Sequence, residues 1–505
     1  RWESQGITKG PLPERFLKYA TGDSTFAASQ LRVQGRALFL DYRCGHCHAV
    51  EAGPDSLVKD HSDGPSFVGI GARRQRDWMA KWILNPHELR EHATMPSLLH
   101  GDQASEDAVA MAAWLSQQRV SDEVVGSFKN GDVESGRQLV ESLHCSGCHR
   151  LRDTENDGEL LVDLDQIDSK FVDGSLVAFL LNPSRHFESI RMPDFMFSVV
   201  EAEDIAAFLV SNSLTTEKSD SPEQNLIDRG KMLVQSTGCL HCHASEIPNQ
   251  HRAKPLRSME SDSWSSGCLD ATPEENNLPR YSLSSEQRKA LAAFGRAKAD
   301  SSLRHVGYHD ASREIEKLNC RACHGTIETV PELTLIGEKL KPEWSASILD
   351  GTLSYKPRPW VEARMPSFGR RGVRIAEGMA MLNGLPPRSG AQTKMDPKLA
   401  EIGRQLISAN GGFACVTCHA VGPAPATAVF ESAGINFAYA NERLQRDFFH
   451  RWVMNPTQID PESKMPVYFS DGESPLPDVL SGSADAQINA IWEYFKQGFD
   501  INPPE

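Results

Sequence analysis

The sequence of 505 residues contains no apolar run near the roughly 18–20 residues that a membrane-spanning helix needs. It also has no excess of basic residues, since 53 lysines and arginines stand against 68 aspartates and glutamates, a formal net charge of −15. Negative charge disfavours nucleic acid, whose phosphates would be repelled, and favours association with basic partners. We therefore expect no transmembrane segment, no nucleic-acid ligand, and protein partners that present a basic docking surface.

Cysteine is nearly absent outside a single motif. Five copies of Cys-x-x-Cys-His use ten of the eleven cysteines, and only Cys268 lies outside them. The copies contain Cys44, Cys47 and His48; Cys145, Cys148 and His149; Cys239, Cys242 and His243; Cys320, Cys323 and His324; and Cys415, Cys418 and His419.

This motif is typical of covalent haem attachment. Its two cysteine sulfurs form thioethers with the haem vinyl groups, and its histidine becomes the proximal ligand of the iron. A zinc site would need a second ligand pair close by, and a thioredoxin-like pair does not explain why a histidine always follows. We therefore predict five covalently bound haem c groups.

An internal repeat surrounds the motifs. A short amphipathic helix with a leading glycine precedes four of them, at Gly35, Gly136, Gly230 and Gly403, and a second helix closes each unit. The closing helices are expected at 108–115, 202–210, 285–294, 376–382 and 485–495. The predicted organisation is an extension at 1–30 followed by five tandem, mostly helical domains at 31–120, 131–212, 226–297, 309–384 and 396–499. The predicted fold class is all-α.

Methionine-proline pairs supply the candidate second ligands of the iron. Four occur, at Met95, Met192, Met365 and Met465, each 41 to 47 residues after a motif histidine. Roughly one such pair would be expected by chance from the composition. A thioether is a soft ligand suited to haem iron, and the proline stiffens the loop that presents it. We predict that these four methionines are axial ligands.

Asparagine-proline pairs end a helix before three of these methionines. Asn85, Asn182 and Asn455 each lie ten residues before the methionine, after an apolar helical segment. In the fourth unit Asp350-Gly351 takes this place, so an altered turn is expected there.

These features together resemble class I cytochrome c in each of four units. The whole chain also resembles planctomycete-type multihaem cytochromes, on the stretches 331–340 and Gly434-Ile435-Asn436-Phe437. The resemblance implies an extracytoplasmic electron carrier. Haem attachment to this motif takes place outside the cytoplasm, so we expect a periplasmic or extracellular protein whose signal peptide is absent from this numbering, since Arg1 opens directly into polar sequence.

The third unit departs from the pattern, because alignment places Leu278 where its methionine should be. Leucine cannot bind iron. The haem at His243 could be five-coordinate, could take Cys268, Met259 or His251 from its own loop, or could receive a ligand from a neighbouring unit or a partner chain. Cys268 is the favoured candidate, since an unpaired thiol outside the cytoplasm needs a reason.

The function expected from the sequence is relay of electrons through a chain of haems, between a redox enzyme and another carrier. One alternative is a peroxidase-like haem enzyme with the third haem as its active site. Another is a conducting or structural subunit of a larger redox complex.

Overall fold

The structure is a computed structural model of the whole chain. It describes residues 24–48, 64–91, 93–120, 130–152, 161–214, 220–250, 264, 267–270, 278–297, 307–327, 330–361, 363–429, 433–469 and 472–504. This part of the chain is mostly helical, with one short parallel pair of strands, β1 (His149–Arg150) and β2 (Val162–Asp163). The predicted all-α class is confirmed at this level. Within these ranges no helix combines the length and apolarity needed to cross a membrane.

The chain divides into two compact units. One comprises residues 1–140, 148–190 and 197–305, and the other comprises 141–147, 191–196 and 306–505. The boundary passes through the second Cys-x-x-Cys-His motif, so that Cys145 belongs to one unit and Cys148 to the other. Each unit is described by itself.

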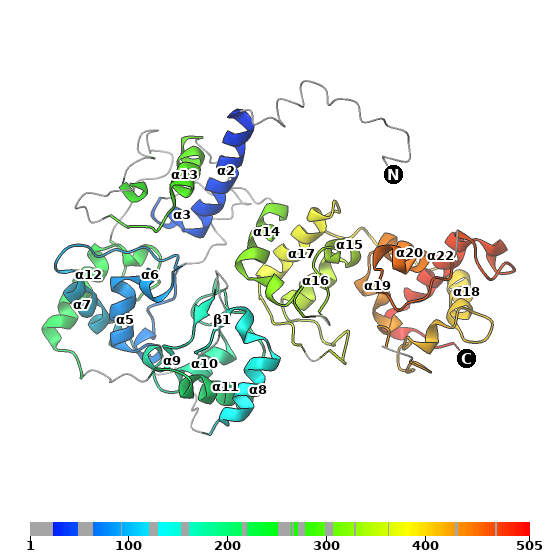
Figure 1. Ribbon diagram of the computed structural model, residues 1–505, viewed down its shortest axis with the longest axis horizontal. Coiled ribbons are helices and arrows are strands. Elements are labelled where there is room, and N and C mark those ends of the chain that lie inside the picture. The colour runs from blue at the N-terminus through cyan, green and yellow to red at the C-terminus, as the bar shows by residue number, and fades with distance from the viewer. Residues whose placement is uncertain are drawn as a thin grey trace. The chain divides into compact units, whose positions relative to one another are not determined.

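A helix precedes every attachment motif, and a second helix lies at every predicted closing position (Figure 1). The preceding helices are α2 (Ser24–Asp41), α8 (Val133–Ser142), α12 (Gln224–Ser236), α14 (Gly307–Lys317) and α18 (Pro397–Ile407). The closing helices are α7 (Ala104–Ser116), α11 (Val199–Ser211), α13 (Ser285–Arg296), α17 (Arg371–Leu382) and α22 (Ala484–Phe495).

The preceding and closing helices cross at a glycine. A Cβ atom placed on Gly403 of α18 would lie 2.1 Å from the carbonyl oxygen of Ala490 in α22. The same atom on Gly136 of α8 would lie 2.0 Å from the carbonyl oxygen of Asp204 in α11. In the fourth pair the glycine is on the closing helix, where a Cβ on Gly378 would lie 2.3 Å from the Cβ of Ala311. The repeated glycines of the sequence are therefore the points of closest helix approach.

Two of the five helix pairs are exchanged relative to the sequence order. A Cβ on Gly35 of α2 would lie 2.0 Å from the carbonyl oxygen of Ala290 in α13, so α2 packs on the helix expected to close the third domain. A Cβ on Gly230 of α12 would lie 1.9 Å from the carbonyl oxygen of Ala110 in α7. Figure 1 shows α2 beside α13 and α12 beside α7. The packing thus differs from the contiguous domains predicted at 31–120 and 226–297.

We name each group of packed elements, or module, after its motif histidine. The His48 module contains 24–48 and 264–297, and the His243 module contains 64–119 and 220–250, with the gaps given above. The other three are contiguous: the His149 module (130–214), the His324 module (307–384) and the His419 module (391–504).

Neighbouring modules meet through two kinds of isolated bridge. In the first kind, a residue two positions after the methionine of a methionine-proline pair bridges to the equivalent residue of another module, as Asp194 bridges to Ser367. In the second kind, the bridge joins two residues that each follow a short helix. Leu340, after α15 (Ile336–Lys339), bridges to Leu444, after α19 (Ala440–Arg443).

The asparagine-proline pairs end helices as predicted. Asn85 terminates α5 (Arg76–Leu84), Asn182 terminates α10 (Ser175–Leu181) and Asn455 terminates α20 (Arg446–Met454). Pro86 and Pro456 begin the next short helices, α6 (Pro86–Leu89) and α21 (Pro456–Ile459), where their missing N–H costs nothing. In the fourth module α16 (Pro342–Leu349) ends at Asp350, and Gly351 has a φ of 79°, which confirms the altered turn.

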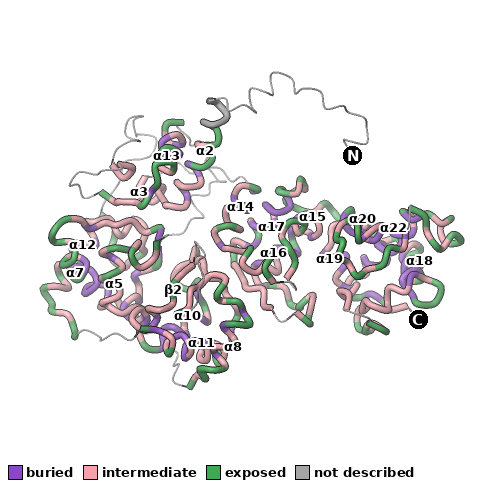
Figure 2. The backbone as a smooth tube through the Cα atoms, viewed as in Figure 1, coloured by how far each residue is buried: buried purple, intermediate pink, exposed green. Residues whose placement is uncertain are grey.

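The His419 module has an extensive apolar core. Buried residues gather where its helices face one another, and they include Leu406, Ile407, Ile488, Ile491 and Phe495 (Figure 2).

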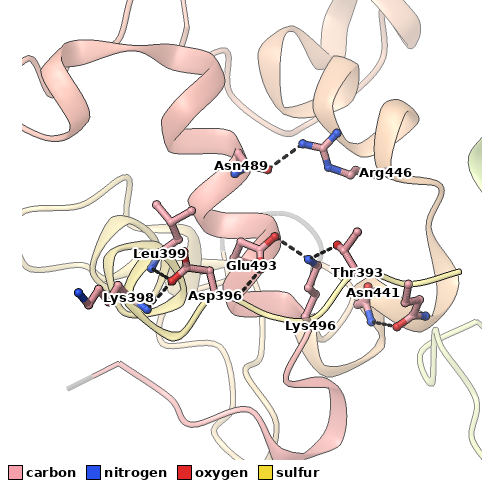
Figure 3. A network of polar contacts seen from close by, with 10 residues as sticks. Thr393, Asp396, Lys398, Leu399, Asn441, Arg446, Asn489, Glu493 and Lys496 are labelled. Atoms are coloured by element: carbon pink, nitrogen blue, oxygen red, sulfur yellow. Dashed lines mark hydrogen bonds and ion pairs between the residues drawn. The ribbon is translucent and has the colours of Figure 1, made fainter.

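Polar contacts hold the first turn of α18 against α22 in this module (Figure 3). The Asp396 side chain caps α18 by accepting from the N–H groups of Lys398 and Leu399, and its own N–H donates to Glu493 of α22 at 2.9 Å. Lys496 then donates to Glu493 at 2.6 Å and to Thr393 at 2.8 Å.

We predict that Gly403→Ala destabilises the protein by about 1–3 kcal/mol, because the new methyl group would overlap the Ala490 carbonyl and force the helices apart. Gly390→Ala is the matched control, since nothing lies within 4 Å of a Cβ there. Urea denaturation of the three proteins measures the difference. Equal midpoints for the two variants would contradict the close crossing.

Candidate functional site

All five Cys-x-x-Cys-His motifs begin in the same backbone conformation. The residue before the first cysteine has a positive φ in every copy: 58° at Arg43, 55° at His144, 79° at Gly238, 54° at Asn319 and 57° at Ala414. Four of these residues are not glycine, so the conformation is strained. Strain repeated at equivalent positions indicates that the turn itself is required.

The turn that follows places two thiols and an imidazole together. A single helical turn covers the first cysteines of each motif, for example Cys44–Cys47 and Cys415–Thr417. The N–H of His419 donates to the Cys415 carbonyl at 3.0 Å, and that of His48 donates to the Cys44 carbonyl at 2.8 Å. No disulfide joins any of the eleven cysteines, all of which lie in described residues.

Four motif histidines are held through Nδ1 by a backbone carbonyl. The acceptors are Val162 for His149 (3.3 Å), Pro65 for His243 (2.7 Å), Pro331 for His324 (2.6 Å) and Ile435 for His419 (2.8 Å). A carbonyl oxygen can only accept, so Nδ1 carries the proton and Nε2 keeps its lone pair. This is the arrangement by which proteins orient a histidine toward a metal.

A glycine and a phenylalanine enclose the ring in two of the modules. The His419 ring stacks on Phe437 at 4.4 Å, and a Cβ on Gly434 would lie 2.3 Å from its Cε1 atom. Burial lowers the pKa of His419, although its hydrogen bond to Ile435 acts in the opposite direction. A lowered pKa favours the neutral imidazole, which is the form that binds a metal.

The His243 ring has the same enclosure, built from residues that follow the first motif. It stacks on Phe67 at 4.4 Å and 8°, and a Cβ on Gly64 would lie 2.5 Å from its Cε1 atom. Gly64-Pro65-Ser66-Phe67 thus corresponds to Gly434-Ile435-Asn436-Phe437. This correspondence was not predicted, although the glycine-x-x-phenylalanine pattern that the two stretches share is visible in the sequence.

Two of the four candidate methionine sulfurs accept a hydrogen bond from a tryptophan. The Trp82 indole donates to Met95 at 3.1 Å, and the Trp452 indole donates to Met465 at 3.2 Å. In both cases the tryptophan lies 13 residues before the methionine. Met365 packs against the apolar core of its own module. In that module the indole of Trp344, near the start of α16, donates to Tyr355 at 2.9 Å.

The first motif lies against the segment that contains Cys268. Cys44 and Leu269 pack against the same buried apolar cluster as Tyr42 and Tyr281, whose rings meet edge-on at 5.5 Å. Burial, followed by the nearby Cys268 thiol, raises the pKa of Cys44 to about 12.

Cys268, which was predicted as a ligand at His243, lies close enough to the first motif to contribute to the raised pKa of both Cys44 and Cys47. Its role as an iron ligand stays a prediction. The other two residues predicted as alternative ligands there, His251 and Met259, lie outside the described residues.

Attachment motifs of different modules touch. A Cβ on Gly147 of the second motif would lie 2.9 Å from the Cβ of Ala322 in the fourth, and the Asn319 side chain donates to the Gly147 carbonyl at 2.7 Å. In the other unit Cys242 of the third motif adds to the electrostatic environment of Cys44 in the first. Residues of different motifs thus lie close together within each unit.

A small cavity of about 70 Å³ between the His243 and His149 modules is lined by Arg73, Arg74, Arg185, His186 and Phe187, among others. Burial and the three arginines lower the pKa of His186 to about 4. The pocket thus has a positive potential suited to carboxylates such as haem propionates.

The residues present fit a covalently attached haem: paired thiols, a histidine oriented through Nδ1, a soft sulfur donor and a cationic pocket. Among the described residues no group of three or more His, Cys, Asp and Glu side chains could hold a bare metal ion. Comparison of the chain with protein-family models, with curated proteins and with solved structures found no match.

We predict that Trp452→Phe lowers the stability of the protein by about 0.5–1 kcal/mol, because the ring is largely kept while the hydrogen bond to the Met465 sulfur is lost. Trp360→Phe is the control, since Trp360 is 46% exposed. Denaturant midpoints measure both changes, and an equal loss in the two variants would show that the indole N–H does not matter.

Proposed function

We propose that the protein is a pentahaem c-type cytochrome that relays electrons between a redox enzyme and another carrier outside the cytoplasm. The observation that carries this proposal is the common geometry of the five motifs, in which a strained residue precedes a turn that brings two thiols to one histidine. When bound, a haem iron accepts and releases single electrons. The tandem class I cytochrome c organisation is part of the same proposal.

The protein's own residues hold and shield each haem. The ten motif cysteines anchor the rings, and the carbonyls of Val162, Pro65, Pro331 and Ile435 orient four of the histidines. The methionine loops supply a neutral sulfur, which favours the reduced state and raises the reduction potential.

Contacts between attachment motifs support relay rather than storage at isolated sites. The Gly147–Ala322 contact leaves no room for a side chain between the second and fourth motifs. A haem edge at either motif would lie close to the other, which is what electron transfer through protein requires.

The net charge of −15, together with two propionates on each haem, supports partners with a basic surface. Such a partner would be attracted before contact, and the attraction would weaken as salt screens the charges.

We predict that the chain, expressed with haem-attachment machinery in an exporting bacterium, carries five haems. Intact mass and the pyridine haemochrome spectrum count them. Replacing Cys415 and Cys418 by alanine should lower the count to four, whereas Cys268→Ala should leave it at five. A haem-free protein that binds zinc would contradict the proposal.

We predict that electron exchange with a small basic redox protein slows at least several-fold between 20 and 200 mM salt, since attraction to the acidic chain is screened. Stopped-flow absorbance measures the rate. A rate that is independent of salt would argue against a basic partner. Rapid turnover of hydrogen peroxide would favour the haem-enzyme alternative.

A further inference from the structure

We propose that Met95 and His243, which lie 148 positions apart in the sequence, bind the same haem iron, and that the haem without a methionine is the one at His48. This proposal rests on the proposed haem-binding function. It differs from the sequence order, which pairs Met95 with His48 and leaves His243 opposite Leu278.

The helix crossings place the third motif with the first methionine loop. Gly230, nine residues before Cys239, meets the Ala110 carbonyl and the Trp114 side chain of α7. Arg229 reinforces this crossing through an ion pair with Asp107 at 2.5 Å. The helix before the third motif is therefore fixed on the helix that closes the Met95 loop.

The proximal side of the His243 site comes from the segment that leads to Met95. Pro65 accepts from His243 Nδ1, Phe67 stacks on the ring, and the Gly64 N–H donates to the Cys242 carbonyl. These are the contacts that Ile435, Phe437 and Gly434 make with the fifth motif.

The distal side follows the same template. Trp82 donates to Met95 as Trp452 donates to Met465. The apolar core that contains Phe67, Ile83 and Leu99 also packs against Cys239 and Leu240 of the third motif. In the fifth module one core likewise joins Met465 to Cys415 and Val416.

Leu278 takes the ligand position of the His48 module. The residue two positions after Leu278, Arg280, pairs in antiparallel fashion with Ser97, two positions after Met95. Asp194 and Ser367 pair in the same register, two positions after Met192 and Met365.

Leu278-Pro279 is thus the structural equivalent of methionine-proline. It is continuous with α13, which packs on α2 directly before the first motif. The His48 site therefore has leucine where the other modules have methionine.

Removing one haem at a time tests the pairing in the full-length holoprotein. One variant replaces Cys44 and Cys47 by alanine, and the matched variant replaces Cys239 and Cys242. The readout is the weak near-red band of ferric haem bound by methionine sulfur, measured per protein. Loss of the first haem should leave the band unchanged, and loss of the third should remove one quarter of it. The reverse result would overturn the pairing.

A cross-link tests the exchange without removing a haem. Arg229→Lys places an amine beside Asp107, and a carbodiimide should join the two in the monomer, as mass spectrometry of the digested protein would show. Unmodified protein, with arginine at 229, is the control. Absence of the 107–229 link in the variant would overturn the exchange. A haem count other than five, by contrast, would count against the proposed function itself.

Discussion

The close crossing of two helices at a glycine is the constraint on which the rest of each module depends. At Gly403 and Gly136 the backbones approach so nearly that any side chain would meet a carbonyl oxygen. One helix leads into a Cys-x-x-Cys-His motif, and the other follows the methionine-proline pair in the modules that have one. The crossing therefore sets the distance between the motif histidine and the residue that faces it, and the intervening loop is free to vary in length.

The same constraint explains how two modules can exchange halves. The two exchanged crossings are built in the same way, from a glycine, an alanine carbonyl and an aromatic residue: Gly35 meets Ala290 and Phe294, and Gly230 meets Ala110 and Trp114. The entropy of closing a loop grows only slowly with its length, by about 0.6 kcal/mol for each doubling. A long connection between two halves is therefore a small cost beside the packing that it permits. Local contacts such as Arg229 with Asp107 then help to select the partner.

The similarity of the helix crossings also limits which features of the fold can be predicted from the sequence. Helix ends at Asn85, Asn182 and Asn455 follow from local chemistry, because proline disfavours a helical conformation in the residue before it. The turn at each motif and the closing helices follow in the same way. The pairing of helices that are distant in the sequence does not follow from local chemistry, because several helices present similar surfaces for the crossing. The alignment of Leu278 with the methionines agrees with the bridge between Arg280 and Ser97, which has the register of the bridge between Asp194 and Ser367. The helix that packs beside its segment, by contrast, depends on long-range contacts that the local sequence does not indicate.

The exchange changes which haems would be neighbours. In sequence order, a site without methionine at the third motif would lie in the middle of the chain of haems, and its different potential would slow transfer across it. In the structure the His243 module, with Met95, meets the His149 module directly, since Arg74 pairs with Phe171 and the Gln75 N–H donates to the Lys170 carbonyl. On the proposed pairing, electrons could pass between these two methionine-ligated haems without using the haem at His48. That haem is then free to differ in potential without interrupting the relay.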